Sequence, residues 1–141
     1  MKSLFVFIQF VGLAFIFITG PVFSKNPGFL AVEIIGILLG LCAIIAMKLD
    51  NLRIYPDLKK DAKLVVSGPY KFIRHPMYLA IILTIIPLTI DYYNQYRFFV
   101  SLIIIIDLLF KLNYEEKLLL NNFTEYKNYT KTTYRLIPFI Y

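Results

Sequence analysis

The sequence predicts an all-α, polytopic membrane protein with about four transmembrane helices, built as one domain over residues 1–141. Three observations lead to this fold class. The composition is 59% hydrophobic and only 17% charged, which is too apolar for an ordinary soluble domain. Apolar runs close to the length of a membrane-spanning helix alternate with short polar segments. A chain of 141 residues most often forms a single domain.

The expected helices follow the apolar runs in order. They are placed at about residues 4–20, 29–47, 77–92 and 97–113. Gly20-Pro21 ends the first run, which also fits a cleaved signal peptide, although its length favours a retained helix. Pro87 lies inside the third run and is expected to kink that helix. The pattern of the fourth run continues past its apolar part to Phe123.

The lysines and arginines predict the topology. Seven of them lie in the polar segment 48–75 and five lie at residue 111 or later, whereas the opposite loops carry only Lys25 and Arg97. Because positively charged loops stay in the cytoplasm, both termini, the segment 48–75 and the C-terminal segment 114–141 are predicted to be cytoplasmic. Topology thereby explains the net charge of +6, and nucleic-acid binding is not expected.

Cysteine and histidine are too scarce for several kinds of chemistry. Cys42 is the only cysteine, so an intramolecular disulfide is excluded. His75 is the only histidine, so a conventional zinc site is not expected and no metal is assigned. Two polar residues within the apolar runs, Gln9 and Glu33, are expected to cap or cross-link helices.

The only histidine lies in a stretch from Ser67 to Tyr78 whose local structure can be predicted. Gly68-Pro69 indicates a turn, and Pro76 disfavours the helical region for His75, which is therefore expected to be extended. Pro76 also suits the first turn of a helix, where its missing N–H costs nothing. The free N–H groups of such a helix start favour a bound anion. We therefore expect a turn, an irregular segment and a helix start, with Arg74 beside it at the membrane surface.

Three charged residues recur on the fourth expected helix. Asp107, Lys111 and Glu115 are spaced i, i+4 and i+8, so they share one face. Charged residues at this depth usually face a bundle interior or a wet cavity and mark a functional path. A lysine that reaches the membrane surface and pairs with its neighbours is the alternative. The spacing alone leaves both interpretations open.

Two motifs together resemble a known family. The first consists of Gly68-Pro69-Tyr70, three further residues, and Arg74-His75-Pro76-Met77-Tyr78. The second consists of Glu115-Glu116, Leu119, Phe123, Tyr126, Tyr129 and Arg135-x-Ile137-Pro138. This pair is similar to the signature of the isoprenylcysteine carboxyl methyltransferase and phospholipid methyltransferase superfamily of membrane-embedded enzymes. The resemblance covers roughly residues 62–141 and implies S-adenosylmethionine as the cofactor.

The resemblance also implies a set of cofactor-binding residues in a cytoplasmic pocket. The positions assigned to this pocket are Lys63, Leu64, Val65, Tyr70, Arg74, His75, Pro76, Met77, Tyr78, Glu115 and Glu116. The ligand makes separate chemical demands on them. Arg74 suits the carboxylate, and Glu115 suits the ammonium group or the ribose hydroxyls. The rings of Tyr70 and Tyr78 suit adenine or the sulfonium cation.

Lys111, Glu115 and Arg135 are the expected catalytic residues. Lys111 matches a family arginine associated with the substrate, and it keeps the charge but loses the bidentate fork. If the acceptor is a carboxylate, no base is needed, and Lys111 or Arg135 would orient the anion. If it is an amine or a thiol, Glu115, Glu116 or His75 becomes the candidate base. The acceptor is expected to be lipophilic and to enter from the surrounding membrane lipids.

Two other functions remain open. The segment Tyr134 to Tyr141 also resembles the tail of sterol reductases, which share the Arg-His-Pro corner and use NADPH, but this chain is far shorter. A small non-enzymatic membrane adaptor with a lipid-binding basic loop would explain the charge asymmetry but not the two motifs. Tyr126, Tyr129 and Tyr134 are expected to be interfacial anchors rather than ligands.

Overall fold

A computed structural model describes residues 2–47 and 64–141. Within these ranges the regular elements are helices, and one isolated β-bridge joins Ile73 to Tyr134. The helices are α1 (Lys2–Ile18), α2 (Pro27–Met47), the 3-10 helix η1 (Gly68–Lys71), α3 (Pro76–Asp91), α4 (Gln95–Asn122) and α5 (Tyr126–Thr132). The predicted all-α class is therefore confirmed for the described part of the chain.

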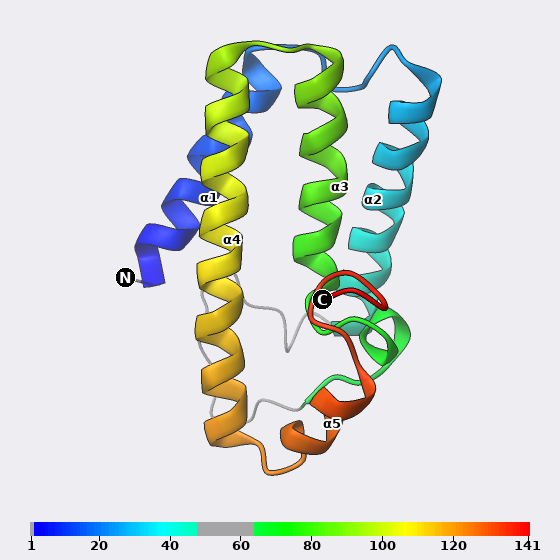
Figure 1. Cartoon of the computed structure of the whole chain (residues 1–141), viewed down its shortest axis with the longest axis vertical. Helices are drawn as coiled ribbons and strands as arrows, with labels where there is room; N and C mark the ends of the chain where they lie inside the picture. The colour runs from blue at the N-terminus through cyan, green and yellow to red at the C-terminus, as the bar shows by residue number, and fades with distance from the viewer. Residues whose placement is uncertain (1, 48–63) are drawn as a thin grey trace.

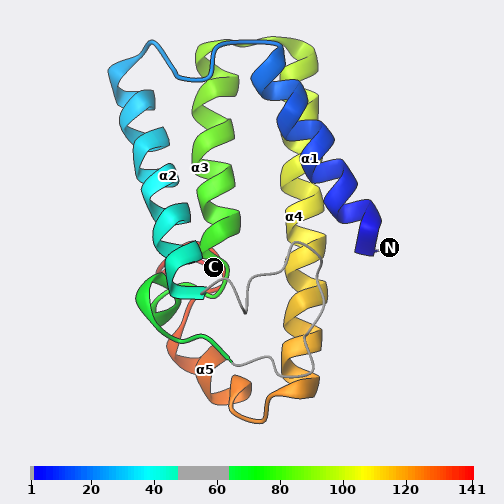
Figure 2. The ribbon, with the colours of Figure 1, turned by 180° about the vertical axis from the view of Figure 1, so that it is seen from behind.

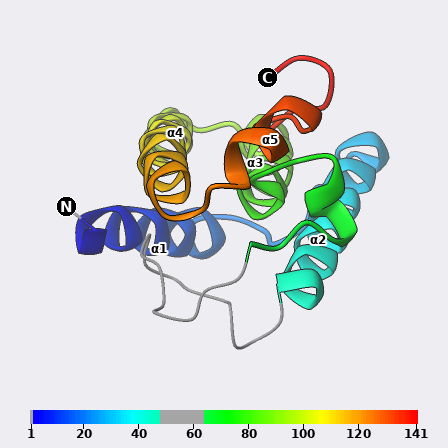
Figure 3. The same ribbon diagram turned by 90° about the horizontal axis from the view of Figure 1, so that it is seen from below.

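The four long helices run alternately in opposite directions and form two packed pairs. Helix α2 packs along α3, and α1 packs along α4 (Figure 1). The view from behind shows the same pairing (Figure 2). The two short connections, residues 19–26 and 92–94, lie together at one end of the bundle, called the loop end below. The opposite end, called the site end, holds η1, α5 and the start of α3 (Figure 3).

The observed helices agree with the expected ones at most boundaries. Helices α1, α2 and α3 begin and end within two residues of the predicted limits. Helix α4 continues past the predicted membrane-span limit of residue 113 to Asn122, as the sequence pattern up to Phe123 predicts, and carries the Glu115-Glu116 pair on its last turns. Pro87 lies inside α3, which is helical on both sides of it. The kink expected there stays a prediction.

Apolar character is strongest on the outer faces of the bundle. Large side chains such as Phe7, Ile45 and Phe110 are 64%, 75% and 64% exposed. Contiguous exposure of this kind is unusual in a soluble monomer and marks an interaction with protein or membrane. By length and composition, α2 can cross a membrane, and it is the single helix of the described ranges that meets both criteria. Helix α1, taken from Ser3 to Ile18, and helix α3 are also apolar but shorter.

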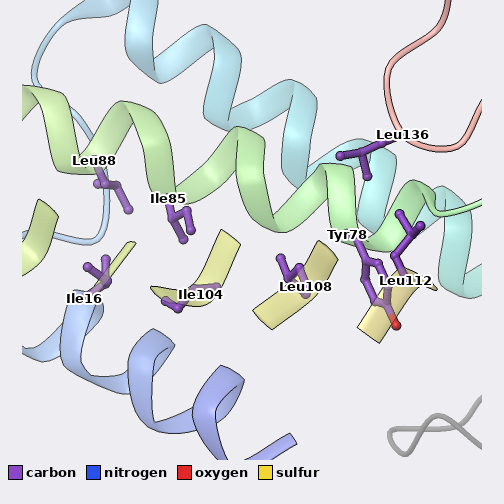
Figure 4. Packing of buried hydrophobic residues seen from close by; sticks show 8 residues of the cluster. All are labelled: Ile16, Tyr78, Ile85, Leu88, Ile104, Leu108, Leu112 and Leu136. Atoms are coloured by element: carbon purple, nitrogen blue, oxygen red, sulfur yellow. The ribbon is translucent and has the colours of Figure 1, made fainter. Parts of the chain in front are cut away.

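The buried core lies where α1, α3 and α4 meet. Figure 4 shows its members, which are Ile16, Tyr78, Ile85, Leu88, Ile104, Leu108, Leu112 and Leu136. Leu136 comes from the segment after α5, so this segment is tied to the bundle. The α2–α3 contact is closest at Gly36, where an added Cβ would lie 2.9 Å from Leu83 Cβ and 3.0 Å from the Ala80 carbonyl oxygen. A larger residue at Gly36 would separate the two helices.

Polar contacts fasten the loop end. Arg97 is buried, and its guanidinium donates to the carbonyl oxygens of Ile16 (3.1 Å) and Leu88 (3.3 Å), near the ends of α1 and α3. These carbonyls belong to helix termini, which lack intrahelical donors. A Cβ on Gly20 would lie 1.9 Å from Arg97 Nη1, so the guanidinium occupies the space that glycine leaves.

A buried carboxylate joins α2 to the first connection. Glu33 is fully buried and accepts hydrogen bonds from the Ser24 backbone N–H (3.2 Å) and from the Ser24 hydroxyl. Nearby, Asp91 Oδ2 accepts from the backbone N–H groups of Lys25 (2.6 Å) and Asn26 (3.3 Å). Glu33 was expected to cap or cross-link helices, but it instead joins α2 to the connection that precedes it.

Candidate functional site

The histidine corner has the turn and the helix start that its sequence predicts, but His75 itself is not extended as expected. Gly68 adopts φ +59° and opens η1, and α3 begins at Pro76. His75 directly precedes this helix with φ −122° and ψ 59°, outside the helical region. A residue before proline avoids the α region for steric reasons, so the corner follows from the His75-Pro76 pair itself.

A short extended segment after α5 is paired with this corner. The backbone N–H of Arg74 donates to the Tyr134 carbonyl (2.8 Å), and that of His75 donates to the Arg135 carbonyl (3.1 Å). In return, the Tyr134 N–H donates to the Phe72 carbonyl (2.9 Å). Residues 133–135 are thereby fixed beside the start of α3, and Arg135 is brought to the end of α4.

Glu116 is the centre of the charged cluster. Arg74 Nε lies 2.7 Å from Oε1 and Arg135 Nε lies 2.8 Å from Oε2, so each carboxylate oxygen has its own guanidinium. Burial would raise the pKa of this carboxyl, but the facing His75 imidazole and the Arg74 guanidinium lower it to about 2. Glu116 is therefore ionised across the physiological range and holds two separate segments of chain against α4.

Arg74 makes a second set of contacts. Its Nη1 donates to the backbone carbonyl oxygens of Thr133 and Thr130 (3.4 Å), at the end of α5. Cations near a helix C-terminus stabilise its unpaired carbonyl groups. One guanidinium therefore joins α3, α4 and α5. This geometry gives Arg74 a structural partner on two sides, and its contact with a cofactor carboxylate stays a prediction.

His75 lies between two carboxylates. Its Nδ1 is 3.6 Å from Glu115 Oε2, and its Nε2 is 3.7 Å from Glu116 Oε1. The imidazole is stacked on the Tyr78 ring with a centroid separation of 5.3 Å, and the Tyr78 hydroxyl donates to Glu115 Oε1 at 2.5 Å. Among the described residues, the buried Nε2 has no hydrogen-bond partner. A buried polar nitrogen without a partner is the feature that a polar ligand would satisfy.

Tyrosines form the wall on the α5 side of the cluster. The Tyr129 hydroxyl donates to the Tyr70 carbonyl oxygen at 2.5 Å, and burial raises the pKa of Tyr129 to about 12 although the nearby Arg74 charge lowers it. Tyr126 is fully buried, and its hydroxyl has no partner within the described ranges. The expectation that Tyr126 is an interfacial anchor is therefore wrong, because its ring packs against Tyr129 instead of facing outward.

The charged stripe of α4 faces the bundle interior. Asp107 and Lys111 are each 5% exposed. Lys111 Nζ donates to Gln9 Oε1 of α1 at 3.1 Å and lies 5.2 Å from the centre of the Tyr78 ring. The expected cross-link through Gln9 is confirmed. The Asp107 Oδ2 atom, one turn further from the site end, is buried and has no hydrogen-bond partner in the part of the chain that the structure describes.

Most of the predicted site residues come together, and a few do not. Six form one connected cluster of contacts, namely Arg74, His75, Tyr78, Glu115, Glu116 and Arg135. Lys111 joins them through the Tyr78 ring. Tyr70 is buried against Tyr129, and Pro76 and Met77 form the first turn of α3. Leu64 and Val65 are half-buried before η1. Lys63 lies outside the described residues.

Three contributors were not assigned to the site from sequence. Thr133 accepts from Arg74, Tyr141 accepts a hydrogen bond from Arg135 at 2.9 Å, and Gln9 fixes Lys111. Only the polarity of Gln9 within an apolar run gave a signal for its role. The contacts of Thr133 and Tyr141 depend on how residues 133–141 fold back, which local sequence does not encode.

An open hollow of about 550 Å³ runs along the first half of α1. Its lining is apolar apart from one serine and consists of Ser3, Leu4, Val6, Phe7, Phe10 and Val11. The neighbouring residues Phe5 and Gln9 contact Tyr114 and Lys111 of α4. The hollow therefore lies on α1, the helix whose Gln9 contacts Lys111.

Among the described residues, no group of three or more His, Cys, Asp or Glu side chains could hold a metal ion.

A helical bundle with apolar outer faces and a buried cluster of charges at one end defines a membrane-type helical protein with one polar site. The profile of the isoprenylcysteine carboxyl methyltransferase (ICMT) family matches residues 27–121, from the start of α2 to the last turn of α4. The match covers more than half of the chain, so the protein belongs to this family and is a methyltransferase of the membrane type. A comparison with curated proteins found no match.

Proposed function

We propose that the protein transfers a methyl group from S-adenosylmethionine to a lipophilic acceptor at the cytoplasmic face of a membrane. The observation that carries the proposal is the buried His75 imidazole between Glu115 and Glu116, in a chain that belongs to the ICMT family. Its Nε2 has no hydrogen-bond partner among the described residues. The family match favours this function over an NADPH-dependent reductase and over a non-enzymatic adaptor.

We also propose that the four long helices cross the membrane. The outer faces of the long helices are rich in exposed aliphatic and aromatic side chains. Of the basic residues in the described ranges, Lys71, Arg74, Lys117, Lys127, Lys131 and Arg135 belong to elements of the site end, whereas the loop end holds Lys25 and Arg97. This distribution predicts a cytoplasmic site end and cytoplasmic termini. The loop-end arginine, Arg97, is used internally by the ends of α1 and α3.

The residues of the corner fit the cofactor. S-adenosylmethionine, when bound, supplies an electrophilic methyl group on a sulfonium. Glu115 has a side chain that is 26% exposed, so it is accessible and offers negative charge for the ammonium group or the ribose hydroxyls. His75 Nε2 offers a hydrogen bond, and the rings of Tyr70 and Tyr78 suit adenine or a cation. Leu64, Val65, Pro76 and Met77 are proposed as apolar contacts.

Lys111 and Arg135 form the proposed acceptor side. Gln9 and the Tyr78 ring fix the Lys111 ammonium, and Glu116 fixes the Arg135 guanidinium. Two held cations would orient an isoprenylcysteine-type carboxylate, for which no base is required. For a lipid amine or thiol, Glu115 would accept the proton, since Glu116 is committed to two guanidinium groups. The enzyme's contribution is mainly to align the reactants and exclude water.

Binding of S-adenosylhomocysteine tests the proposed cofactor site. Isothermal titration of purified protein should show binding to the wild type and strong weakening in His75→Ala and Glu115→Ala. Glu125→Ala is the matched control, because Glu125 is an exposed acid on the same side of the molecule and makes no side-chain cap. Normal binding by both site variants would remove the proposed site. Tight binding of NADPH in its place would favour the reductase.

A further inference from the structure

Residues 136–141, called the hook below, form a closed loop at the site end. The Leu136 and Ile137 backbone N–H groups both donate to the Tyr141 carbonyl oxygen, at 2.8 and 3.0 Å. The Tyr141 N–H donates back to the Ile137 carbonyl at 3.0 Å. Leu136 is 6% exposed and belongs to the buried core beside Tyr78 (Figure 4). The hook therefore has a defined shape and a fixed base.

The tip of the hook is apolar and exposed. Phe139 and Ile140 are 86% and 79% exposed, among the most exposed large apolar residues of the described chain. Phe139 has φ +66°, a left-handed conformation that bulky residues rarely adopt. Tyr134 links the hook to Phe72, because its N–H donates to the Phe72 carbonyl and its ring lies 5.2 Å from the Phe139 ring. Phe72 is also 66% exposed. A strained backbone that presents two large apolar side chains outward indicates a surface that is covered in use.

The position of the hook indicates what covers it. Figures 1 and 3 place it beside the start of α3, at the height where the apolar helix α2 ends. This is the level at which membrane proteins place aromatic residues among lipid headgroups. Lys71, next to Phe72, is exposed and adds a positive charge suited to lipid phosphates. The positive charge of Lys71, the height of the hook and the apolar exposure of Phe139 and Ile140 all favour a lipid surface as the partner.

The base of the hook touches the charged cluster. Arg135 Nη1 donates to the Tyr141 hydroxyl at 2.9 Å, and its guanidinium lies 5.4 Å from the centre of the Tyr141 ring. Arg135 Nε is at the same time 2.8 Å from Glu116 Oε2. Any displacement of the hook therefore moves the partner that orients Arg135 against Glu116.

We propose that the hook inserts Phe139 and Ile140 into the interfacial layer of the bilayer and thereby holds Arg135 in position at the site. The partner is the lipid surface of the membrane in which the protein lies. This inference rests on the membrane embedding in the proposed function. It makes Tyr141 a positioning residue for Arg135 and makes the order of the cluster depend on lipid contact.

The absence of tryptophan from the sequence allows a direct test of insertion. Phe139→Trp gives a single fluorophore at the tip, which is measured in vesicles of phosphatidylcholine and phosphatidylglycerol with brominated acyl chains. Phe99→Trp, on the outer face of α4, is the embedded control, and Asn121→Trp, exposed at the end of α4, is the aqueous control. We expect brominated lipid to quench Phe139→Trp at least half as strongly as Phe99→Trp, and not to quench Asn121→Trp.

The controls separate the two ways in which this test can fail. Quenching of Phe99→Trp without quenching of Phe139→Trp overturns insertion of the hook and leaves embedding intact. A lack of quenching at Phe99→Trp overturns the embedding itself. Protection of Phe139→Trp from aqueous iodide without quenching by lipid means that a protein partner or a second copy covers the hook, which also overturns the inference.

Trypsin tests the link between lipid contact and Arg135. In vesicles, Phe139→Ser/Ile140→Ser should release the hook, so cleavage after Arg135 should become about tenfold faster than in the wild type. The conservative pair Phe139→Leu/Ile140→Val should restore slow cleavage. Cleavage after Lys127, exposed on α5, is the internal reference and should not change. Equal rates of cleavage after Arg135 in all three proteins would overturn the link.

Discussion

Each end of the bundle holds a buried arginine, but the two arginines have different partners. Arg97 at the loop end donates to the backbone carbonyls of Ile16 and Leu88. Arg74 at the site end also reaches helix-terminal carbonyls, but its Nε is paired with the Glu116 carboxylate at 2.7 Å. At the loop end the charge fastens helix ends. At the site end it also fixes a carboxylate in a cluster of ionisable groups.

The comparison shows which feature distinguishes a ligand site from a purely structural contact between helix ends. Arg97 Nε, like His75 Nε2, is buried without a hydrogen-bond partner among the described residues, so an unpartnered nitrogen alone does not identify a site. The site end differs because the His75 imidazole lies between two carboxylates, with Glu116 facing the unpartnered Nε2 and Glu115 facing Nδ1, and is stacked on the Tyr78 ring. A ligand that carries both charge and an aromatic base can satisfy all of these groups.

Removal of Glu116 should have the largest effect. In Glu116→Ala, two guanidinium groups lose their carboxylate, and leaving a buried charge unpaired costs about 3–5 kcal/mol. Because Arg135 is 37% exposed and can turn to solvent, we expect the lower part of this range. Chemical unfolding in detergent measures the loss, and Glu125→Ala is the control. A stability equal to that of the wild type would mean that Glu116 does not fasten the site end.

Removal of Arg97 should weaken the fold and spare the site. Arg97→Met leaves the Ile16 carbonyl without its side-chain donor, whereas the Leu88 carbonyl keeps the Tyr92 N–H at 3.2 Å. One buried acceptor left unpaired costs about 1–3 kcal/mol, which is the expected loss of stability. The affinity for S-adenosylhomocysteine, measured by titration of the folded fraction, should equal that of the wild type. Weakened binding at full folding would contradict the separation between the two ends.

The sequence predicts the helices well because apolar length and proline or glycine positions are local signals. The limits of α1, α2 and α3 follow from such signals. The continuation of α4 to Asn122 also follows the predicted pattern, whereas α5 was not predicted, since it lies in polar, tyrosine-rich sequence that contacts elsewhere stabilise.

The site was predictable only where a motif is continuous. The corner around His75 and the Glu115-Glu116 pair are visible as short patterns. The contacts of Arg74 with α5 and of Arg97 with α1 join residues that are far apart in sequence, and periodicity carries no information about them. Tyr126 was misassigned for the same reason, because its burial depends on how α5 packs against the cluster.

Loss of the Tyr78 hydroxyl should affect binding more than stability. Tyr78→Phe removes the hydrogen bond to Glu115 Oε1 and keeps the ring that packs in the core. Without this hydrogen bond the Glu115 carboxylate can turn away from the position in which it would meet the ligand, so binding of S-adenosylhomocysteine should weaken by about tenfold, or about 1.4 kcal/mol. The Glu115 side chain is 26% exposed, so water can replace the lost hydroxyl and limit the loss of stability. Titration measures the affinity, and the unfolding midpoint should change little. Unchanged affinity would show that Glu115 does not need this partner.

Acid should weaken the fold by removing the charge of Glu116 and its ion pairs. Its pKa is lowered from 4.5 to about 2 in the folded protein, so the folded state prefers the ionised carboxyl. The resulting stabilisation is present above the unfolded pKa near 4.5 and is lost as pH falls toward 2. Unfolding measured between these pH values should show a steeper decline in the wild type than in Glu116→Gln. Parallel declines would contradict the ionised pair.

Transfer of an isotopically labelled methyl group tests the central claim most directly. Membranes that contain the protein are incubated with labelled S-adenosylmethionine, and the label is measured in the lipid-extractable fraction. We predict label with the wild type and with Arg97→Lys, and none above background with Glu115→Ala. Equal label with the wild type and Glu115→Ala would contradict methyl transfer at the site end.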